Sequence, residues 1–310
     1  MGTSMVRGRM RQVATFSTAA LLLSTLSLSC GNAEDVSPAA SPKETEAIAA
    51  RDGEAALAGA FDYAMYDALL GEYVDEQGLV DYRSLQANRA ELDDFLRSMA
   101  ELSREDFEAW PEQERLAFWI NAYNAITPER IIDQYPIQKG GLIAGLRYPA
   151  NSIRQIPGVW KKIANTVMGE SVTLDSIEHE ILRVKFKEPR IHAAIVCAAL
   201  SCPPLRSEAF VAERLDEQLG DQSRQFLANE IRFRIDRAKK RVYLSPIFNW
   251  FGTDFVGNYN TERILTAHSK AQDAVLEYVS RYIDDEDAQF ILSETYAVVF
   301  LDYDWTLNEK

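Results

Sequence analysis

The stretch LAFWINAYNAI, residues Leu116 to Ile126, decides how the rest of the chain folds around it. Apolar residues occupy nearly every position, so a helix formed here has no polar face and must be buried. Two amides, Asn121 and Asn124, lie three residues apart and therefore on one side of that helix. Pro128 has no backbone N–H, and Thr127 is a suitable cap for a new helix. The sequence predicts a buried central helix that breaks and restarts at Thr127-Pro128.

The two asparagines need fixed partners because an unpaired buried amide costs about 1–3 kcal/mol. In the structural interpretation, the amides attach loops to the core through hydrogen bonds to the backbone. In the functional interpretation, Asn121 and Asn124 form the floor of a site and orient an imidazole or an oxyanion. Both interpretations keep the two residues as candidates.

Apolar spacing predicts further helices on both sides of the central one. Helical spacing occurs over 63–73 and 92–99. A capping box at 175–178 predicts the start of a short helix, with His179 on its second turn. Ser207 is suited to cap a later helix that buries apolar positions from 211 to 226.

Strands are predicted mainly in the second half of the chain. The apolar run IHAAIVCAA, residues 191–199, is typical of a buried strand. Residues 231–235 and 241–244 alternate as a hairpin, and 296–301 form a last strand. Because helices and strands are segregated, we expect an α+β fold with N-terminal helices packed on a small, mostly antiparallel sheet.

Composition excludes several classes of protein. Of the 310 residues, 47% are hydrophobic and 10% aromatic, which excludes a disordered or collagen-like chain. The 33 basic and 47 acidic residues give a net charge of −14. A chain with this balance has no positive field for a phosphate backbone, so we expect no nucleic-acid partner.

The N-terminus has the pattern of a secretory leader. Three arginines precede an uncharged run from Val13 to Leu28, and Cys30 follows Leu-Ser-Leu-Ser in an arrangement similar to a lipoprotein cleavage site. We expect residues 1–29 to be a lipoprotein signal peptide, with ordinary signal-peptidase cleavage as the alternative. Residues 30–60 are then a tether and 61–310 a single domain. The expected location is the bacterial cell envelope, lipid-anchored through Cys30, in the outer membrane facing the periplasm.

Cys197 and Cys202 are the other two cysteines, and three alternatives are open for them. In an oxidising envelope they can form a small disulfide loop. They lack the spacing of a zinc site, so we expect no metal and no cofactor. The third alternative is a thiolate nucleophile, best placed at Cys202, because Pro203 after it forces an extended corner that an imidazole could activate.

Two of the three histidines are candidates for chemistry. His179 lies at the edge of an apolar stripe, and His192 begins an apolar run where its ring needs a partner. His268 lies in the polar segment TAHSKAQ and is expected at the surface. Asp254 sits among aromatic residues in LSPIFNWFGTDF and requires a histidine or an arginine such as Arg206 as its partner.

Six blocks of sequence together resemble the bacterial domain of unknown function 547 family. They are VDYRSL at 80–85, AFWINAYNAIT at 117–127, LDSIEHEILR at 174–183, RIHAAIVCAALSCPPL at 190–205, LSPIFNWFGTDF at 244–255 and YDWTLNE at 303–309. The resemblance implies no activity, because that of the family is unassigned. It places the family's recurring polar positions on Asn121, Tyr123, Asn124, Glu178, His179, His192, Cys197 and Cys202. Pro128 departs from the family pattern, which usually continues with an apolar residue.

Two hypotheses of function follow. In the first, the domain is a hydrolase or acyl-transfer enzyme with Cys202, or less favourably Cys197, as nucleophile and His179 or His192 as base. Asn121 and Asn124 then orient the reacting groups. In the second, it is a non-catalytic binding or scaffold domain with a structural disulfide. The sequence does not identify a small-molecule or peptide partner.

Overall fold

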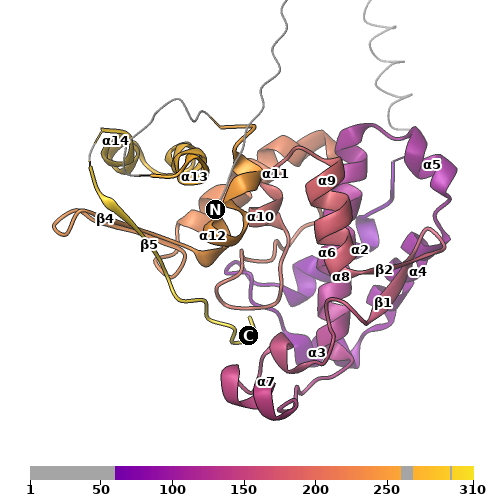
Figure 1. Cartoon of the computed structure of the whole chain (residues 1–310). Coiled ribbons are helices and arrows are strands. Elements are labelled where there is room, and N and C mark those ends of the chain that lie inside the picture. Colours follow the sequence, from indigo (N-terminus) through magenta and orange to yellow (C-terminus); the bar gives the residue numbers. More distant parts are fainter. Residues whose placement is uncertain (1–59, 260–267, 294) are drawn as a thin grey trace, which may run out of the picture. The chain divides into compact units, whose positions relative to one another are not determined.

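A computed structural model of the chain describes residues 60–259, 268–293 and 295–310 (Figure 1). Its helices are α2 (Ala64–Tyr73), α3 (Tyr82–Ala87), α4 (Ala90–Glu101), α5 (Arg104–Ala109), α6 (Glu112–Ile132), α7 (Leu142–Arg147), α8 (Leu174–Ser176), α9 (Arg183–Lys185), α10 (Ile191–Ala194), α11 (Leu215–Leu227), α12 (Pro246–Phe251), α13 (Lys270–Ser280) and α14 (Asp285–Ser293). A π-helical segment, Ile177–Leu182, joins α8 to α9. The strands are β1 (Ala164–Val167), β2 (Glu170–Thr173), β3 (Phe233–Asp236), β4 (Arg241–Leu244) and β5 (Ala297–Phe300).

Helix α6 is the centre of the first hydrophobic core, as its sequence predicts. Helices α3 and α4 pack against it, and α2 packs on α3 and α4. Tyr66 of α2 stacks on Phe95 of α4 with ring centroids 4.4 Å apart. The predicted helices at 63–73 and 92–99 are confirmed as α2 and α4.

The predicted break at Pro128 is wrong, because α6 continues through it to Ile132. Proline supplies no N–H to the preceding turn, but Ile131 and Ile132 beyond it are buried in the core. The Thr127 hydroxyl donates to the Tyr123 carbonyl over 2.9 Å. This hydrogen bond lies within α6, so Thr127 does not cap a new helix. The free energy gained by burial of the last turn of α6 is larger than the cost of the missing hydrogen bond.

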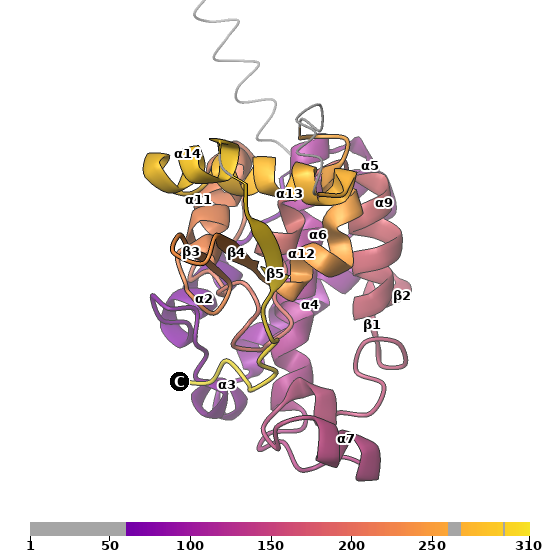
Figure 2. The ribbon, with the colours of Figure 1, turned by 60° about the vertical axis from the view of Figure 1, so that its left-hand side comes forward.

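Figure 2 shows a three-stranded sheet formed by β3, β4 and β5. Side chains of this sheet are part of the second hydrophobic core. Strands β3 and β4 form the predicted antiparallel hairpin, and β5 pairs with β4 in parallel. Strands β1 and β2 form a separate antiparallel hairpin against α4. The α+β class and the mostly antiparallel pairing are confirmed. The three-stranded sheet shares its core with the C-terminal helices α11, α12 and α13, whereas the N-terminal helices contact the two-stranded hairpin.

The C-terminal tail connects β5 back to the N-terminal helices, as the yellow trace in Figure 1 shows. Val80 donates its backbone N–H to the Asn308 carbonyl over 2.9 Å. The hydroxyl of Tyr82 donates to the Asn308 side chain over 2.7 Å. Leu200 donates to the Thr306 carbonyl, so the tail also lies against the loop that follows α10.

Three local predictions are wrong. Residues 191–199 form one helical turn, α10, and then an irregular segment in which Ala198 has a positive φ of 57°. Helix α11 begins at Leu215, so Ser207 does not cap it. The capping pair before the π-helical segment is Thr173 with Ser176, two residues earlier than the predicted box.

In the part of the chain that the structure describes, no helix combines the length and apolar character that a membrane crossing requires.

Candidate functional site

A pocket of about 690 Å³ lies where segments from both cores meet. Its wall is formed by α6, the loop after α7, the π-helical segment, α10 with the irregular segment after it, α12 and the C-terminal tail. Both candidate histidines, His179 and His192, and both candidate cysteines, Cys197 and Cys202, line it. Sulfur and imidazole groups that the sequence keeps apart therefore share one cavity.

His192 is held by an aspartate and an aromatic ring. Its Nε2 lies 2.9 Å from Oδ2 of Asp254, and its ring stacks on Phe251 with centroids 4.3 Å apart. Arg183 donates two hydrogen bonds, of 2.6 and 2.9 Å, to the same carboxylate. The partner of Asp254 is thus a histidine with Arg183. Arg206, the arginine suggested by the sequence, pairs instead with Glu208 and Asp221.

The charges around Asp254 keep it ionised. Burial alone would raise the pKa of this carboxyl, but the hydrogen bonds from His192 and Arg183 lower it well below its usual range. Burial lowers the pKa of His192, and Asp254 only partly opposes that effect. A neutral imidazole that donates Nε2–H to Asp254 has Nδ1 as its remaining acceptor nitrogen.

Glu178 and His179 form a second titratable pair in the pocket wall. His179 Nδ1 lies 4.0 Å from Glu178 Oε1 and 3.1 Å from the guanidinium of Arg183. The other carboxylate oxygen of Glu178 lies 3.4 Å from the Tyr123 hydroxyl. His179 Nε2 lies 3.7 Å from Asp175. The wide turn of the π-helix carries both members of the pair, and such turns often occur at functional sites.

The surroundings shift the pKa values of this pair in opposite directions. Burial raises the pKa of Glu178 to about 7, against the opposing effects of Arg183 and Tyr123. Burial lowers the pKa of His179, with Asp175 opposing and Arg183 adding to the effect. Near neutral pH the pocket therefore contains a carboxyl that can give a proton and an imidazole that can accept one.

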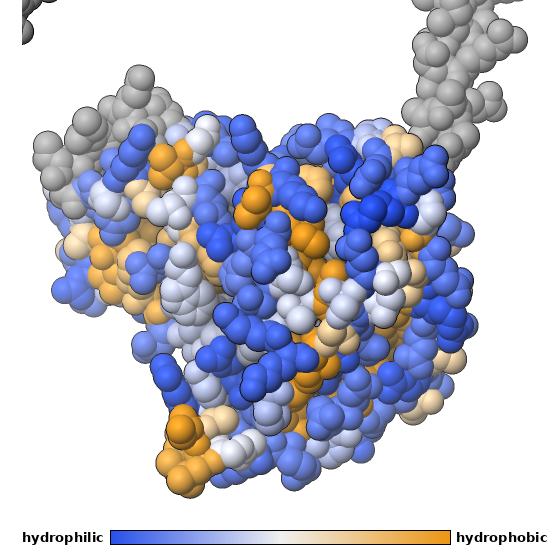
Figure 3. Space-filling model, turned by 45° about the vertical axis from the view of Figure 1, so that its right-hand side comes forward, coloured by the Kyte–Doolittle hydropathy of each residue, from blue (hydrophilic) through white to orange (hydrophobic). Residues whose placement is uncertain are grey.

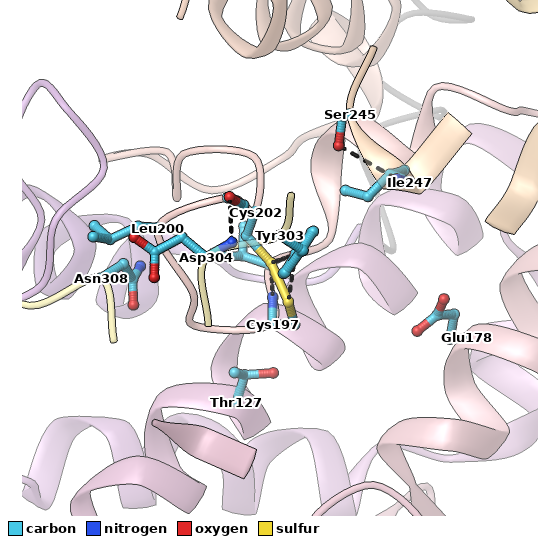
Figure 4. The surroundings of a disulfide bond; sticks show 12 residues. Thr127, Glu178, Cys197, Leu200, Cys202, Ser245, Ile247, Tyr303, Asp304 and Asn308 are labelled. Atoms are coloured by element: carbon cyan, nitrogen blue, oxygen red, sulfur yellow. Dashed lines mark hydrogen bonds between the residues drawn. A yellow bond between two sulfur atoms is a disulfide. The ribbon is translucent and has the colours of Figure 1, made fainter. Parts of the chain in front are cut away.

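Cys197 and Cys202 are joined in a disulfide, the first of the three alternatives that the sequence left open. The Tyr303 hydroxyl lies 3.2 Å from the Cys197 sulfur and 3.1 Å from the Cys202 sulfur (Figure 4). The backbone N–H of Cys197 donates to the Cys202 sulfur over 3.0 Å. In this state neither sulfur is a thiolate that could act as a nucleophile. The disulfide contributes to the pocket wall.

An aromatic wall around Arg154 completes the pocket. The guanidinium carbon lies 4.6 Å from the centre of the Tyr148 ring, 4.7 Å from that of Trp305 and 5.2 Å from that of Trp160. Arg154 also contacts the Tyr148 hydroxyl at 2.6 Å. Among the described residues, no carboxylate forms an ion pair with Arg154. This cation is thus positioned in the pocket by rings and not by an opposite charge.

The two asparagines are buried and paired, as predicted, but they do not line the pocket. Asn121 donates to the Phe210 carbonyl over 2.7 Å and accepts from the Phe210 N–H over 3.0 Å. Asn124 donates to the Ala194 carbonyl and accepts from the Val196 N–H, both over 2.9 Å. Their geometry is that of the structural interpretation, in which each amide holds a loop on α6.

These amides also explain two of the wrong predictions. Asn124 forms hydrogen bonds with the Ala194 carbonyl and the Val196 N–H. In a strand, these two backbone groups would pair with a neighbouring strand. Asn121 does the same for Phe210, inside the segment predicted as the start of a helix. A side-chain amide on the central helix replaces regular backbone pairing at both places.

His268, expected at the surface, has a side chain only 4% exposed. Its Nδ1 lies 3.7 Å from Asp273, and its ring lies 5.3 Å from that of Tyr296. Its polar neighbours in the sequence gave no sign of this burial. His268 does not line the pocket. No group of three or more potential metal-ligating side chains was found among the described residues.

Several residues of the site were not predicted from the sequence. Arg154 and Tyr303 line the pocket, and Arg183 holds Asp254 behind it. Arg183 follows His179 by four residues, a spacing that places the two on one helix face and could have suggested their contact. For Tyr303 no comparable signal exists, because the two cysteines that its hydroxyl contacts lie more than 100 residues away along the chain. Arg154 has Tyr148 and Trp160 close to it in sequence, but its third aromatic neighbour, Trp305, lies far away.

The family model described as "Protein of unknown function, DUF547" matches residues 107–227. This range contains all six candidate site residues and Glu178. Asp254 and Tyr303 lie outside it. No curated protein matches the chain, and no solved structure matches it.

Proposed function

The chain belongs to the DUF547 family, and we propose that its pocket binds a small anionic ester or amide and hydrolyses it by general acid–base catalysis. The observation that carries the proposal is the Glu178–His179 pair in the wall of an aromatic-lined pocket. Perturbed titratable groups that face each other in a cleft are typical of catalytic sites.

The residues divide the proton transfers between them. A neutral His179 takes a proton at Nδ1 from a water molecule as the water oxygen bonds to the acyl carbon of the ligand, and the Arg183 N–H that Nδ1 accepts in the structure is released in this step. Protonated Glu178 donates its proton to the leaving oxygen or nitrogen as that bond breaks. One water is consumed and two products leave. The proton on His179 then returns to Glu178, directly or through water, and restores the starting state.

Water is the nucleophile in this proposal because both sulfurs are held in the disulfide. The cysteine-dependent reaction considered from the sequence would require a reductant to free a thiolate first. His192 has a positioning role in this scheme. Its contacts with Asp254 and Phe251 fix the wall against which the ligand binds.

Arg154 supports the choice of an anionic ligand. A guanidinium with aromatic neighbours and no ion-pair partner among the described residues can bind a carboxylate or phosphate with two hydrogen bonds. The rings of Trp160, Trp250 and Trp305, all in the pocket wall, offer surfaces for the apolar part of the ligand.

We also propose that the protein acts in the bacterial envelope as a lipoprotein anchored through Cys30. The leader pattern at 1–29 supports this location. The disulfide is consistent with it, because structural disulfides persist in oxidising compartments. The proposed site for anchoring is the outer membrane, with the domain facing the periplasm.

The test compares a charged and an uncharged chromogenic ester, p-nitrophenyl succinate and p-nitrophenyl acetate. We expect faster hydrolysis of the succinate. Glu178→Gln should lower its kcat by at least about tenfold, and Glu180→Gln, the same change at an exposed neighbour, should leave it unchanged. Arg154→Ala should raise KM for the succinate only.

Three results would decide against this proposal. Equal activity of the Glu178→Gln and Glu180→Gln variants would show that Glu178 takes no part in the reaction. Equal turnover of the two esters, unaffected by Arg154→Ala, would show that Arg154 does not bind the anionic group of the ligand. Binding of succinate to the wild type without turnover of either ester would favour the non-catalytic binding domain.

A further inference from the structure

Helix α7 carries an apolar surface with no partner in the described structure. Leu142, Ile143 and Leu146 are 82%, 80% and 82% exposed. Their spacing places them on one side of the short helix. Among the described residues, the other large hydrophobic side chains that stand out as exposed are less so, from 44% for Met65 and Ile231 to 70% for Val184. We call these three residues the α7 tip.

The α7 tip is a protrusion held in place by a buried amide. Gln155 donates to the carbonyls of Ala144, Tyr148 and Pro149 over 2.9–3.1 Å and accepts from the Gly140 N–H over 2.8 Å. Figures 1 and 2 place α7 at the lower end of the molecule, and Figure 3 shows an apolar knob at that end. The loop is thus fixed at its base while its aliphatic side chains point outward.

The sequence segment that carries the tip has a charge opposite to that of the whole chain. Residues 134–169 contain five cations and no aspartate or glutamate, although the net charge of the chain is −14. Lys139 and Arg147, which flank α7 in sequence, are both exposed. Aliphatic side chains surrounded by lysine and arginine are typical of segments that enter the interface of an anionic bilayer.

We propose that the α7 tip is a membrane-docking surface that inserts Leu142, Ile143 and Leu146 among anionic lipids. This inference is independent of the proposed hydrolysis. The same positive segment continues through Arg154 to Lys161 and Lys162 in the pocket wall. Tyr148, directly after α7, contacts Arg154 in the pocket wall, so a docked tip brings this side of the pocket toward the membrane surface. This contact is separate from the proposed lipid on Cys30.

The test measures hydrogen–deuterium exchange of the full chain with vesicles of phosphatidylcholine and phosphatidylglycerol at 3:1. A local measurement is needed because the N-terminal segment can itself hold the chain on the vesicles. We expect backbone amides of 141–148 to exchange several-fold more slowly on these vesicles, and less so on pure phosphatidylcholine or in high salt. Leu142→Ser/Ile143→Ser/Leu146→Ser should abolish this protection.

Val184→Ser provides the matched control, because it removes another exposed aliphatic side chain outside the tip. It should leave protection of 141–148 unchanged. Unchanged exchange at 141–148 while the chain is bound to vesicles would overturn the proposal. Protection that appears without vesicles and grows with protein concentration would also overturn it, because the tip would then contact a second copy of the chain.

Discussion

The imidazole of His192 and the carboxylate of Asp254, 62 residues apart in the sequence, meet through a 2.9 Å contact between Nε2 and Oδ2. Arg183 shares that carboxylate, so one aspartate from the turn after α12 links α10 to Arg183, the first residue of α9, directly after the π-helical segment. The candidate site depends on this contact, because His192 and His179 reach the pocket from α10 and the π-helical segment.

Removal of the Asp254 charge should destabilise the protein at neutral pH. The pKa of Asp254 is lowered on folding, so its stabilising contribution is present above its unfolded pKa and is lost as pH falls through the folded pKa. We expect Asp254→Asn to lower the free energy of unfolding clearly at pH 7 and less at pH 3. Urea denaturation at the two pH values measures this.

The exposed Asp302 gives the control for that experiment, since Asp302→Asn makes the same change away from the network. A loss of stability at Asp254 that was equal at pH 3 and pH 7 would show that packing, and not the charge, accounts for the effect.

The contribution of Glu178 to the free energy of unfolding should have the opposite pH dependence. Its pKa is raised from 4.5 to about 7, so the folded state holds a proton that the unfolded state has released between these pH values. Stability is therefore lost as pH rises through this range, by about 3 kcal/mol above pH 7. We expect Glu178→Gln to raise the melting temperature relative to wild type at pH 8 and to change it much less at pH 4.

Glu180→Gln should show no such pH-dependent difference from wild type. A Glu178→Gln variant that was equally stable relative to wild type at pH 4 and pH 8 would be inconsistent with a protonated, buried carboxyl.

Replacement of a core asparagine should cost stability, because it leaves backbone groups unpaired. Asn121→Leu removes both hydrogen bonds to Phe210. We expect a loss of about 3 kcal/mol in the free energy of unfolding, from two buried groups without partners. Asn88→Leu, at an exposed position, should cost much less. Equal denaturation midpoints for wild type and Asn121→Leu would refute the role assigned to this amide.

The disulfide should be structural. We expect both Cys197 and Cys202 to resist alkylation until a reductant is added, as measured by mass spectrometry of the denatured protein. The Cys197→Ala/Cys202→Ala variant should lose about 2 kcal/mol of stability, as expected for a short loop. It should still hydrolyse the succinate ester. Complete loss of turnover in a folded double variant would restore a cysteine-dependent mechanism.

The sequence was informative where patterns are local. Apolar spacing located α2, α4 and the central helix, and alternation located the hairpin of β3 and β4. It failed where a distant side chain replaced backbone pairing. The run from Ile191 had strand composition, yet Asn124 of α6 holds its backbone in another shape.

The candidate site could be predicted in part for the same reason. His179, His192 and the cysteines are uncommon residue types, and their number alone singled them out. Asp254 was noticed because a carboxylate among aromatic rings needs a partner. Arg154 lies in the aromatic wall with Trp305, which is far away in sequence. Only the path of the C-terminal tail brings these two together.

The proposed acid–base chemistry requires Glu178 to hold its proton near neutral pH beside His179. Titration of the protein labelled with ¹³C at the glutamate carboxyl carbons, with Glu178→Gln to assign the signal, measures this directly. The structure predicts a midpoint of about 7 for Glu178. A midpoint near 4.5, the ordinary value for glutamate, would contradict the acid–base role of the pocket.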